Sequence, residues 1–193
     1  MTADNRAFCV IGASGSGKSL LGDILREGYG YNVLSLSSGV RRAAQIEGLV
    51  NPTREDLQLL ANRYRAEKGD DIFAKMVTED PIFQSPKLVL EGARHPGEIQ
   101  YLQQTYNGVM RVVGIVASLE TRFHRVMNRT GKADAINFET FSRNDERENG
   151  ATGQSFGQNN AKCFELADDI VENEWDSQDA FRDALLAKFG SLI

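Results

Sequence analysis

Short apolar segments alternate with longer amphipathic segments along the chain. Apolar runs rich in β-branched residues and free of regular polar alternation predict buried strands at 7–13, 31–36, 87–91, 110–117 and 169–171. Apolar positions at helical spacing predict helices at 20–27, 53–67, 96–104, 120–129, 138–148 and 178–188. This alternation predicts an α/β fold with a parallel sheet, helices on both faces, and ligands at the carboxyl ends of the strands.

The first apolar run leads directly into Gly-Ala-Ser-Gly-Ser-Gly-Lys-Ser, which has the form G-x-x-x-x-G-K-[ST]. Its glycines can turn backbone N–H groups inward, and the helix that follows directs its positive end to the same point. In such a loop the lysine reaches the β- and γ-phosphates, and the final hydroxyl binds Mg²⁺. The motif therefore predicts an ATP and Mg²⁺ site formed by Gly12, Ala13, Ser14, Gly15, Ser16, Gly17, Lys18 and Ser19.

Bulk composition narrows the class of protein. The 193 residues, 41% hydrophobic and 25% charged, are typical of one globular domain, and the formal charge of −5 argues against extended nucleic-acid binding. No apolar run approaches the roughly 20 residues that span a bilayer. Cys9 and Cys163 lack metal-ligand spacing and favour reduced thiols. We expect a cytoplasmic protein of one domain, 1–193, that binds neither nucleic acid nor membrane, with a lid-like segment near 128–160.

Charged residues follow the second and third predicted strands. Arg41 and Arg42 stand at one strand-to-helix junction, and Glu91 and Arg94 follow the next strand. Arginines at this edge of the sheet can bind a phosphate in a bidentate manner, although one of the adjacent pair could be a solvated surface residue. Glu91 is placed to hold Mg²⁺ or polarise an acceptor hydroxyl, and the alternative is a carboxylate that only pairs with Lys18.

A third group of arginines lies on the predicted helix 120–129. Arg122, Arg125 and Arg129 are spaced i, i+3 and i+7 and share one face. Phosphoryl transfer needs cations around the transferred group, so this face predicts that Arg125 or Arg129, before Arg122, reaches the phosphates. The alternative is a solvated basic face. Arg143 and Arg147 lie among acidic residues, which predicts surface ion pairs.

Taken in order, these motifs resemble the nucleoside monophosphate kinase and dephospho-CoA kinase branch of P-loop kinases. Within that branch they are most similar to nucleotide kinases related to dephospho-CoA kinase, over nearly the whole chain. The matching features are the loop at 12–19, Arg41, Tyr64-Arg65 with Gly69, Glu91-Gly92-Ala93-Arg94, the arginine-rich helix, and the run at 167–173. The sequence departs from the pattern in two places: Glu91 replaces the usual Asp, and Ser37-Ser38 replaces Gly-Asp.

The resemblance implies a three-layer P-loop kinase fold with a five-stranded parallel sheet in the order 2-3-1-4-5 and a lid insertion. It implies transfer of the ATP γ-phosphoryl to a small nucleotide-like acceptor: a (deoxy)nucleoside monophosphate or, alternatively, dephospho-CoA. The implied roles are catalysis for Lys18, Glu91, Arg125 and Arg129, acceptor binding for Arg41, Arg65 and Arg94, and Mg²⁺ binding for Ser19 and Glu91. A nucleotide-binding switch protein is the alternative of a different class, although the chain has no N-K-x-D motif typical of GTPases.

Overall fold

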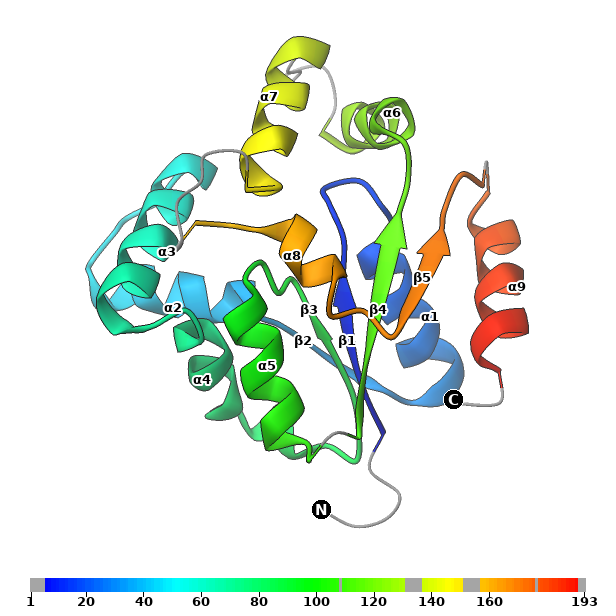
Figure 1. The fold of residues 1–193 in the computed structure, drawn as a ribbon, viewed down its shortest axis with the longest axis horizontal. Helices are drawn as coiled ribbons and strands as arrows, with labels where there is room; N and C mark the ends of the chain where they lie inside the picture. The colour runs from blue at the N-terminus through cyan, green and yellow to red at the C-terminus, as the bar shows by residue number, and fades with distance from the viewer. Residues whose placement is uncertain (1–5, 108, 131–136, 151–156, 176, 191–193) are drawn as a thin grey trace.

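The chain forms a five-stranded parallel sheet in the order β2-β3-β1-β4-β5, the order that the resemblance to P-loop kinases implies (Figure 1). The computed structural model describes residues 6–107, 109–130, 137–150, 157–175 and 177–190, with backbone alone for Arg129 and Thr130. The strands are β1 (Arg6–Ile11), β2 (Asn32–Ser35), β3 (Lys87–Glu91), β4 (Met110–Val116) and β5 (Asp169–Glu172). All five overlap the apolar segments that predict them.

Successive residues of the central strand β1 face two different cores. Cys9 and Ile11 pack in a core with Leu102, whereas Phe8 and Val10 pack in a core with Leu185. Because side chains alternate across a strand, a β-strand with helices on both faces must be apolar at every position. This explains the unbroken apolar run that precedes the glycine-rich loop.

Helices cover both faces of the sheet and make the three layers (Figure 1). Helices α1 (Lys18–Tyr29) and α9 (Gln178–Phe189) bury leucine, isoleucine and phenylalanine side chains against one face. Helices α4 (Ile72–Thr78), α5 (Pro96–Thr105) and α8 (Asn160–Phe164) contribute to the core on the other face. The short 3₁₀ helix η1 (Pro81–Gln84) leads into β3 and adds Phe83 to that second core.

Helices α2 (Ser37–Ile46) and α3 (Arg54–Lys68) form an arm beside strand β2 (Figure 1). Together with α4 they enclose a third apolar cluster that includes Ala61 and Phe73. Thr53 caps α3: its hydroxyl accepts from the Asp56 N–H, and the Asp56 carboxylate accepts from the Thr53 N–H. This cap fixes where α3 begins, and it therefore fixes the position of Arg54 at its first turn.

Helices α6 (Leu119–Thr130) and α7 (Phe138–Glu148) lie above the carboxyl ends of the strands (Figure 1). Rings of Phe123, Phe138 and Phe141 pack together, with centroids 5.3 Å and 5.6 Å from that of Phe123. Arg122 of α6 donates to both carboxylate oxygens of Asp145 on α7, at 2.5 Å and 2.9 Å. Apolar and ionic contacts thus fix α7 to α6 and hold it over the sheet edge.

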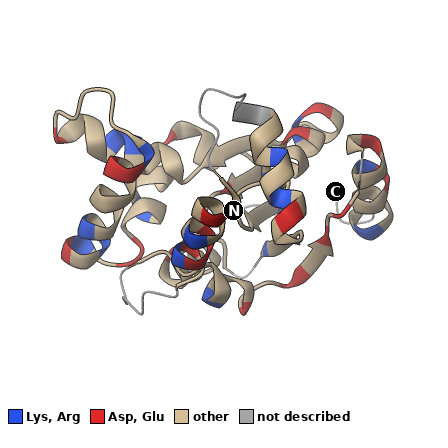
Figure 2. Cartoon of the chain, turned by 90° about the horizontal axis from the view of Figure 1, so that it is seen from above, with Lys and Arg blue, Asp and Glu red and all other residues tan. Residues whose placement is uncertain are grey.

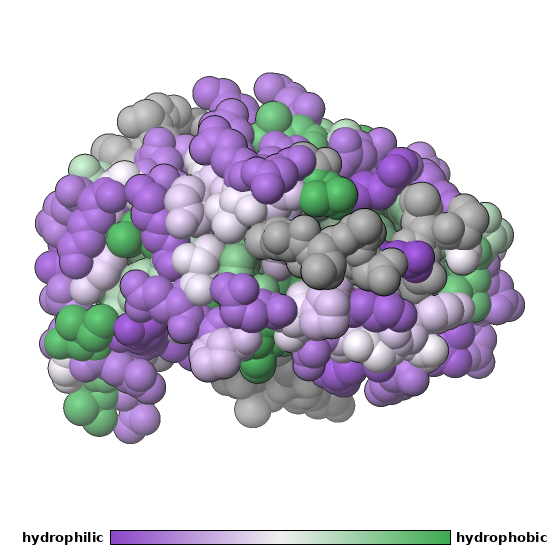
Figure 3. Space-filling view, turned by 90° about the horizontal axis from the view of Figure 1, so that it is seen from below, coloured by the Kyte–Doolittle hydropathy of each residue, from purple (hydrophilic) through white to green (hydrophobic). Residues whose placement is uncertain are grey.

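The surface carries charges of both signs. Basic and acidic residues lie side by side on the same helices when the molecule is seen from above (Figure 2). The opposite side is mostly hydrophilic, with small and separate hydrophobic areas (Figure 3). No helix in the described part of the chain has the length and apolar character needed to cross a lipid bilayer. Residues 131–136 and 151–156 of the predicted lid-like segment lie outside the described residues.

Candidate functional site

The glycine-rich loop at 12–19 joins the end of β1 to the start of α1, as its motif predicts. Gly15 and Gly17 have φ values of 82° and 103°, which side chains other than glycine rarely adopt. A Cβ at Gly15 would lie 2.6 Å from the Arg122 carbonyl oxygen, and one at Gly17 would overlap the Asn173 amide nitrogen. Both positions therefore require glycine, for conformation and for space.

This loop presents hydrogen-bond donors without acceptors. The backbone N–H groups of Gly15, Gly17, Lys18 and Ser19 donate to no other described residue. The Ser16 hydroxyl is buried and also lacks a partner among the described residues. Unsatisfied donors at a helix N-terminus form a site for an anion. The Asn173 side chain holds the loop from below by donating to the Ser16 carbonyl oxygen at 2.8 Å.

Two clefts, each of about 310 Å³, meet at the loop and share Lys18 and Ser19. One lies among α2, α3 and the end of β3, and we call it the arginine cleft. The other lies between the loop, α6 and the segment after β5, and we call it the Trp175 cleft. Two ligands, one in each cleft, can therefore approach Lys18 from different sides.

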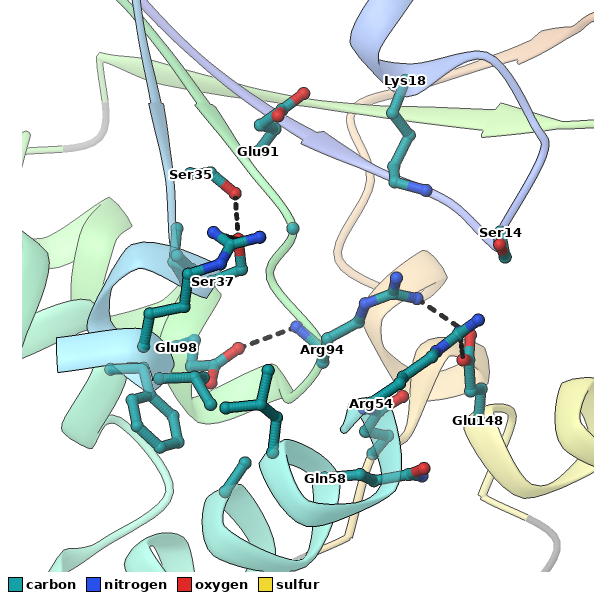
Figure 4. Close-up of a pocket in the computed structure, with 18 of the residues that line it drawn as sticks. Ser14, Lys18, Ser35, Ser37, Arg54, Gln58, Glu91, Arg94, Glu98 and Glu148 are labelled. Carbon is teal, nitrogen blue, oxygen red and sulfur yellow. Dashed lines mark hydrogen bonds and ion pairs between the residues drawn. The ribbon is translucent and has the colours of Figure 1, made fainter. Parts of the chain in front are cut away.

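The arginine cleft brings together residues from distant parts of the chain (Figure 4). Arg41 of α2 lines it and donates to the Ser37 hydroxyl at 3.0 Å. Arg94 lines it from the segment between β3 and α5, and Glu91 lines it from the end of β3. The predicted acceptor-side residues Arg41, Arg65 and Arg94 and the predicted metal ligands Ser19 and Glu91 all border this one cleft.

Carboxylates hold three of the cleft's arginines. The Glu148 carboxylate accepts from Arg94 at 3.2 Å through one oxygen and from Arg54 through the other (Figure 4). The Glu98 carboxylate accepts from the Nε and Nη2 of Arg65 at 3.2 Å and 2.9 Å. Arg41 has no carboxylate partner within the described residues, so its guanidinium is the one most available to a ligand.

The arginine cleft also has an apolar part to its lining. Leu36, Val40, Leu57, Ala61 and Phe73 border it, and Gln58 adds one polar group. A cleft bordered by both guanidinium groups and apolar side chains suits a ligand that carries a phosphate and a flat apolar group.

The Trp175 cleft takes its shape from α6 and from the segment that follows β5. Arg125 lines it, and its Nη2 donates to the Trp175 carbonyl oxygen at 3.0 Å and to the Asn173 Oδ1 at 3.3 Å. The Trp175 side chain is 47% exposed at this cleft. The structure thus places Arg125, a predicted catalytic residue, in the cleft opposite Arg41 and Arg94.

Lys18 lies at the junction of the two clefts. Its Nζ donates to the Ala13 carbonyl oxygen at 2.7 Å. Burial and the nearby Arg94 guanidinium lower the pKa of Lys18 from its ordinary value to about 7, and the carboxylates of Glu148 and Glu91 oppose that change. The ammonium group is therefore poised to gain stabilisation from any anion that enters either cleft.

Other predicted arginines lie away from the clefts. Arg122 is committed to Asp145 and lies against the loop through its backbone. The Arg42 guanidinium pairs with Glu79 at 2.8 Å. Arg143 pairs with Glu139 at 3.2 Å on the exposed face of α7, as predicted. The side chain of Arg129 lies outside the described residues.

Sequence reasoning missed several residues of the clefts: Arg54, Gln58, Glu148, Gln158 and Trp175. Arg54 could have been suspected, because the Thr53 cap places it at the first turn of a helix facing the sheet edge. Nothing in the sequence pointed to Glu148, because it lies among charged residues of α7 that are typical of an exposed helix face. Glu98 lies in the first turn of α5, where it accepts from the Arg94 and His95 N–H groups, and it also binds the Arg65 guanidinium.

The parallel sheet order and the loop between β1 and α1 define a P-loop kinase fold. The structure aligns with a gluconokinase from Sinorhizobium meliloti 1021 over 99% of this chain and 95% of the other, with a TM-score of 0.59 and 16% identity. It aligns with shikimate kinase from Acinetobacter baumannii over 96% and 93%, with a TM-score of 0.53 and 14% identity.

Sequence relatives give the family. No family model matches the chain. A UPF0200 protein of Methanoregula boonei is 33% identical over 86% of each chain. UPF0200 protein MK0400 of Methanopyrus kandleri is 32% identical over 91% of this chain and 85% of its own. The chain therefore belongs to the UPF0200 family.

Proposed function

We propose that this protein transfers the γ-phosphoryl group of ATP, with Mg²⁺, to the phosphate of a (deoxy)nucleoside monophosphate. The observation that supports this most directly is the meeting of two separate clefts at Lys18 and Ser19. A phosphotransferase needs donor and acceptor sites that converge on the transferred group. A switch protein that only binds or hydrolyses a nucleotide has no need of the second cleft.

The loop and the Trp175 cleft suit the donor. The backbone N–H groups of the loop and Lys18 would hold the phosphates of ATP, and the exposed Trp175 and Arg125 would border its base. The Ser19 hydroxyl and the Glu91 carboxylate both border the arginine cleft and could hold Mg²⁺ together with phosphate oxygens and water. When bound, the ion would neutralise charge on the transferred group.

The arginine cleft suits a small phosphorylated acceptor. Arg41, Arg54 and Arg94 offer planar guanidinium groups, which match phosphate better than the hydroxyl of an uncharged acceptor. The apolar part of its lining, which includes Val40 and Phe73, suits a base. A volume of about 310 Å³ lies within the range of small-molecule sites in proteins and is compatible with a nucleoside monophosphate.

A coupled assay of ADP release tests this proposal. The wild-type protein is given ATP, Mg²⁺ and one acceptor at a time: the ribo- and deoxyribonucleoside monophosphates, dephospho-CoA, gluconate and shikimate. We expect release that depends on one or more monophosphates and is absent from the Lys18→Ala protein. ADP release with dephospho-CoA alone, or with gluconate or shikimate alone, would identify that compound as the acceptor in place of a nucleoside monophosphate. ADP release that no acceptor stimulates would favour the switch protein.

A further inference from the structure

The arginine cleft holds an acidic residue that the proposed reaction does not use. Glu148 comes from α7, and its side chain is only 7% exposed. Glu98 is committed to Arg65 and to backbone N–H groups, and Glu91 is placed at the metal side of the cleft. Among the described carboxylates, Glu148 alone pairs with the guanidinium groups of Arg54 and Arg94.

The geometry of this contact resembles that of a bound anion. One carboxylate oxygen of Glu148 accepts from Arg94, and the other accepts from Arg54, so a single group bridges two guanidinium ions (Figure 4). Arg94 comes from the segment after β3 and Arg54 from α3. Two oxygens of a phosphate can bridge two arginines in the same manner.

The charges of the cleft also leave room for an anion. Five basic and three acidic side chains line it: Lys18, Arg41, Arg54, Arg65 and Arg94 against Glu91, Glu98 and Glu148. Without Glu148, fewer negative charges would balance the positive charges of the arginines and Lys18. The pKa of Lys18 already depends on two of these groups, because Arg94 lowers it and Glu148 raises it. A bound dianion would replace the single negative charge of Glu148 with two.

We propose that Glu148 occupies the binding place of the acceptor phosphate when the cleft has no ligand, and that the phosphate must displace it from Arg54 and Arg94. Glu148 then sets a threshold for acceptors, because only an anion that binds two arginines better than a carboxylate can enter. The inference rests on the proposed function only in taking the arginine cleft as the acceptor site.

The opposite role for Glu148 is to orient the two arginines for the phosphate. The two roles predict changes of opposite sign. A competing carboxylate that holds the arginines about nine-tenths of the time raises the apparent Kd of the acceptor about tenfold. An orienting carboxylate lowers that Kd, because it arranges the guanidinium groups before binding.

Direct titration separates these roles. Inorganic phosphate, and then the best monophosphate from the ADP-release screen or else deoxythymidine monophosphate, is titrated calorimetrically into the nucleotide-free protein without ATP. We expect Glu148→Gln to bind both ligands at least about fivefold more tightly than wild type. Glu148→Asp keeps the charge but shortens the reach, and we expect a smaller gain. The matched control is Glu146→Gln, which removes the same charge from an exposed position of α7 and should leave the Kd unchanged.

The results distinguish this inference from the proposed function. Equal or weaker binding by folded Glu148→Gln and Glu148→Asp proteins would overturn the inference, even if nucleoside monophosphates are good acceptors. Tighter binding by Glu148→Gln with Glu146→Gln unchanged would support it, even if no monophosphate stimulates ADP release. If Glu148→Gln does not fold, the Glu148→Asp protein decides: tighter binding supports the inference, and unchanged or weaker binding overturns it.

Discussion

The loop and the arginine cleft are both suited to phosphate, but they are built in different ways. The loop spans residues 12–19 and offers the backbone N–H groups of Gly15, Gly17, Lys18 and Ser19, which donate to no other described residue. The arginine cleft uses side chains from α2, α3 and the segment after β3, and carboxylates of α5 and α7 hold some of them. A backbone site depends on local conformation, whereas a side-chain site depends on how distant elements pack.

This difference predicts how each region responds to substitution. In the proposed reaction Lys18 of the loop contacts the transferred group, so loss of Lys18 should appear in turnover. The arginine cleft shares its work among several guanidinium groups, so the loss of one should appear as weaker acceptor binding. The predictions below test this division in order of decreasing effect.

The largest effect is expected at the shared residue. We expect Lys18→Ala to reduce kcat at least about a hundredfold, because it removes a preorganised positive charge from the phosphates. ADP release with the preferred acceptor measures the effect, and circular dichroism checks the fold. Near-normal turnover by a well-folded variant would separate the loop from the reaction.

A smaller effect on kcat is expected at Glu91. If Glu91 positions Mg²⁺ or the acceptor, Glu91→Gln should lower kcat about thirtyfold and change ATP affinity less than about twofold. Steady-state kinetics and a titration with an ATP analogue give the two quantities. Collapse of ATP affinity with a normal kcat at saturation would make Glu91 a binding residue instead.

In the arginine cleft the effect should move from kcat to KM. We expect Arg41→Ala and Arg94→Ala to raise the acceptor KM at least about tenfold, about 1.4 kcal/mol, with little change in ATP affinity. Arg42→Ala is the matched control, because its guanidinium pairs with Glu79 outside the cleft, and its KM should change less than about twofold. An unchanged acceptor KM in both test variants would place the acceptor elsewhere.

The smallest effect is a protonation change at Lys18. Its pKa is lowered to about 7 by burial and by Arg94, so at pH 8 most of the ligand-free protein has a neutral Lys18. Bound phosphates favour the charged form of Lys18. Nucleotide binding at pH 8 should therefore be accompanied by the uptake of about one proton by Lys18, and binding at pH 6 by almost none. Calorimetry in buffers of different ionisation enthalpy measures the uptake, and Lys18→Met should abolish it.

Much of the fold could be predicted from sequence, because the patterns that specify it are local. The five strands, their order and most helices follow from apolar runs, helical spacing and the resemblance to P-loop kinases. No range was predicted for α2, which was expected only as the helix that follows the second strand at Arg41 and Arg42. Helices α4 and α8 and the 3₁₀ helix η1 were not predicted. These three are short, and periodicity over so few residues does not distinguish a helix from a loop.

The candidate site could be predicted only in part. The position of Arg41, Glu91 and Arg94 after predicted strands indicated that they lie near the loop, and the structure places all three in a cleft that borders it. The partners of the arginines could not be predicted, because Glu148 is 54 residues from Arg94 and 94 residues from Arg54. The many charged residues of α7 are typical of a solvated helix face. Glu148 points into the cleft only because α7 packs over the sheet edge. The catalytic and binding roles themselves remain predictions.

The bond between Asn173 and the Ser16 carbonyl oxygen joins positions 157 residues apart. Asn173 directly follows β5, the edge strand that pairs with β4. During synthesis the glycine-rich motif therefore leaves the ribosome long before the residue that holds it in place. We expect a fragment that carries the motif but ends before β5 to have the sequence of the loop without the contact that fixes its conformation.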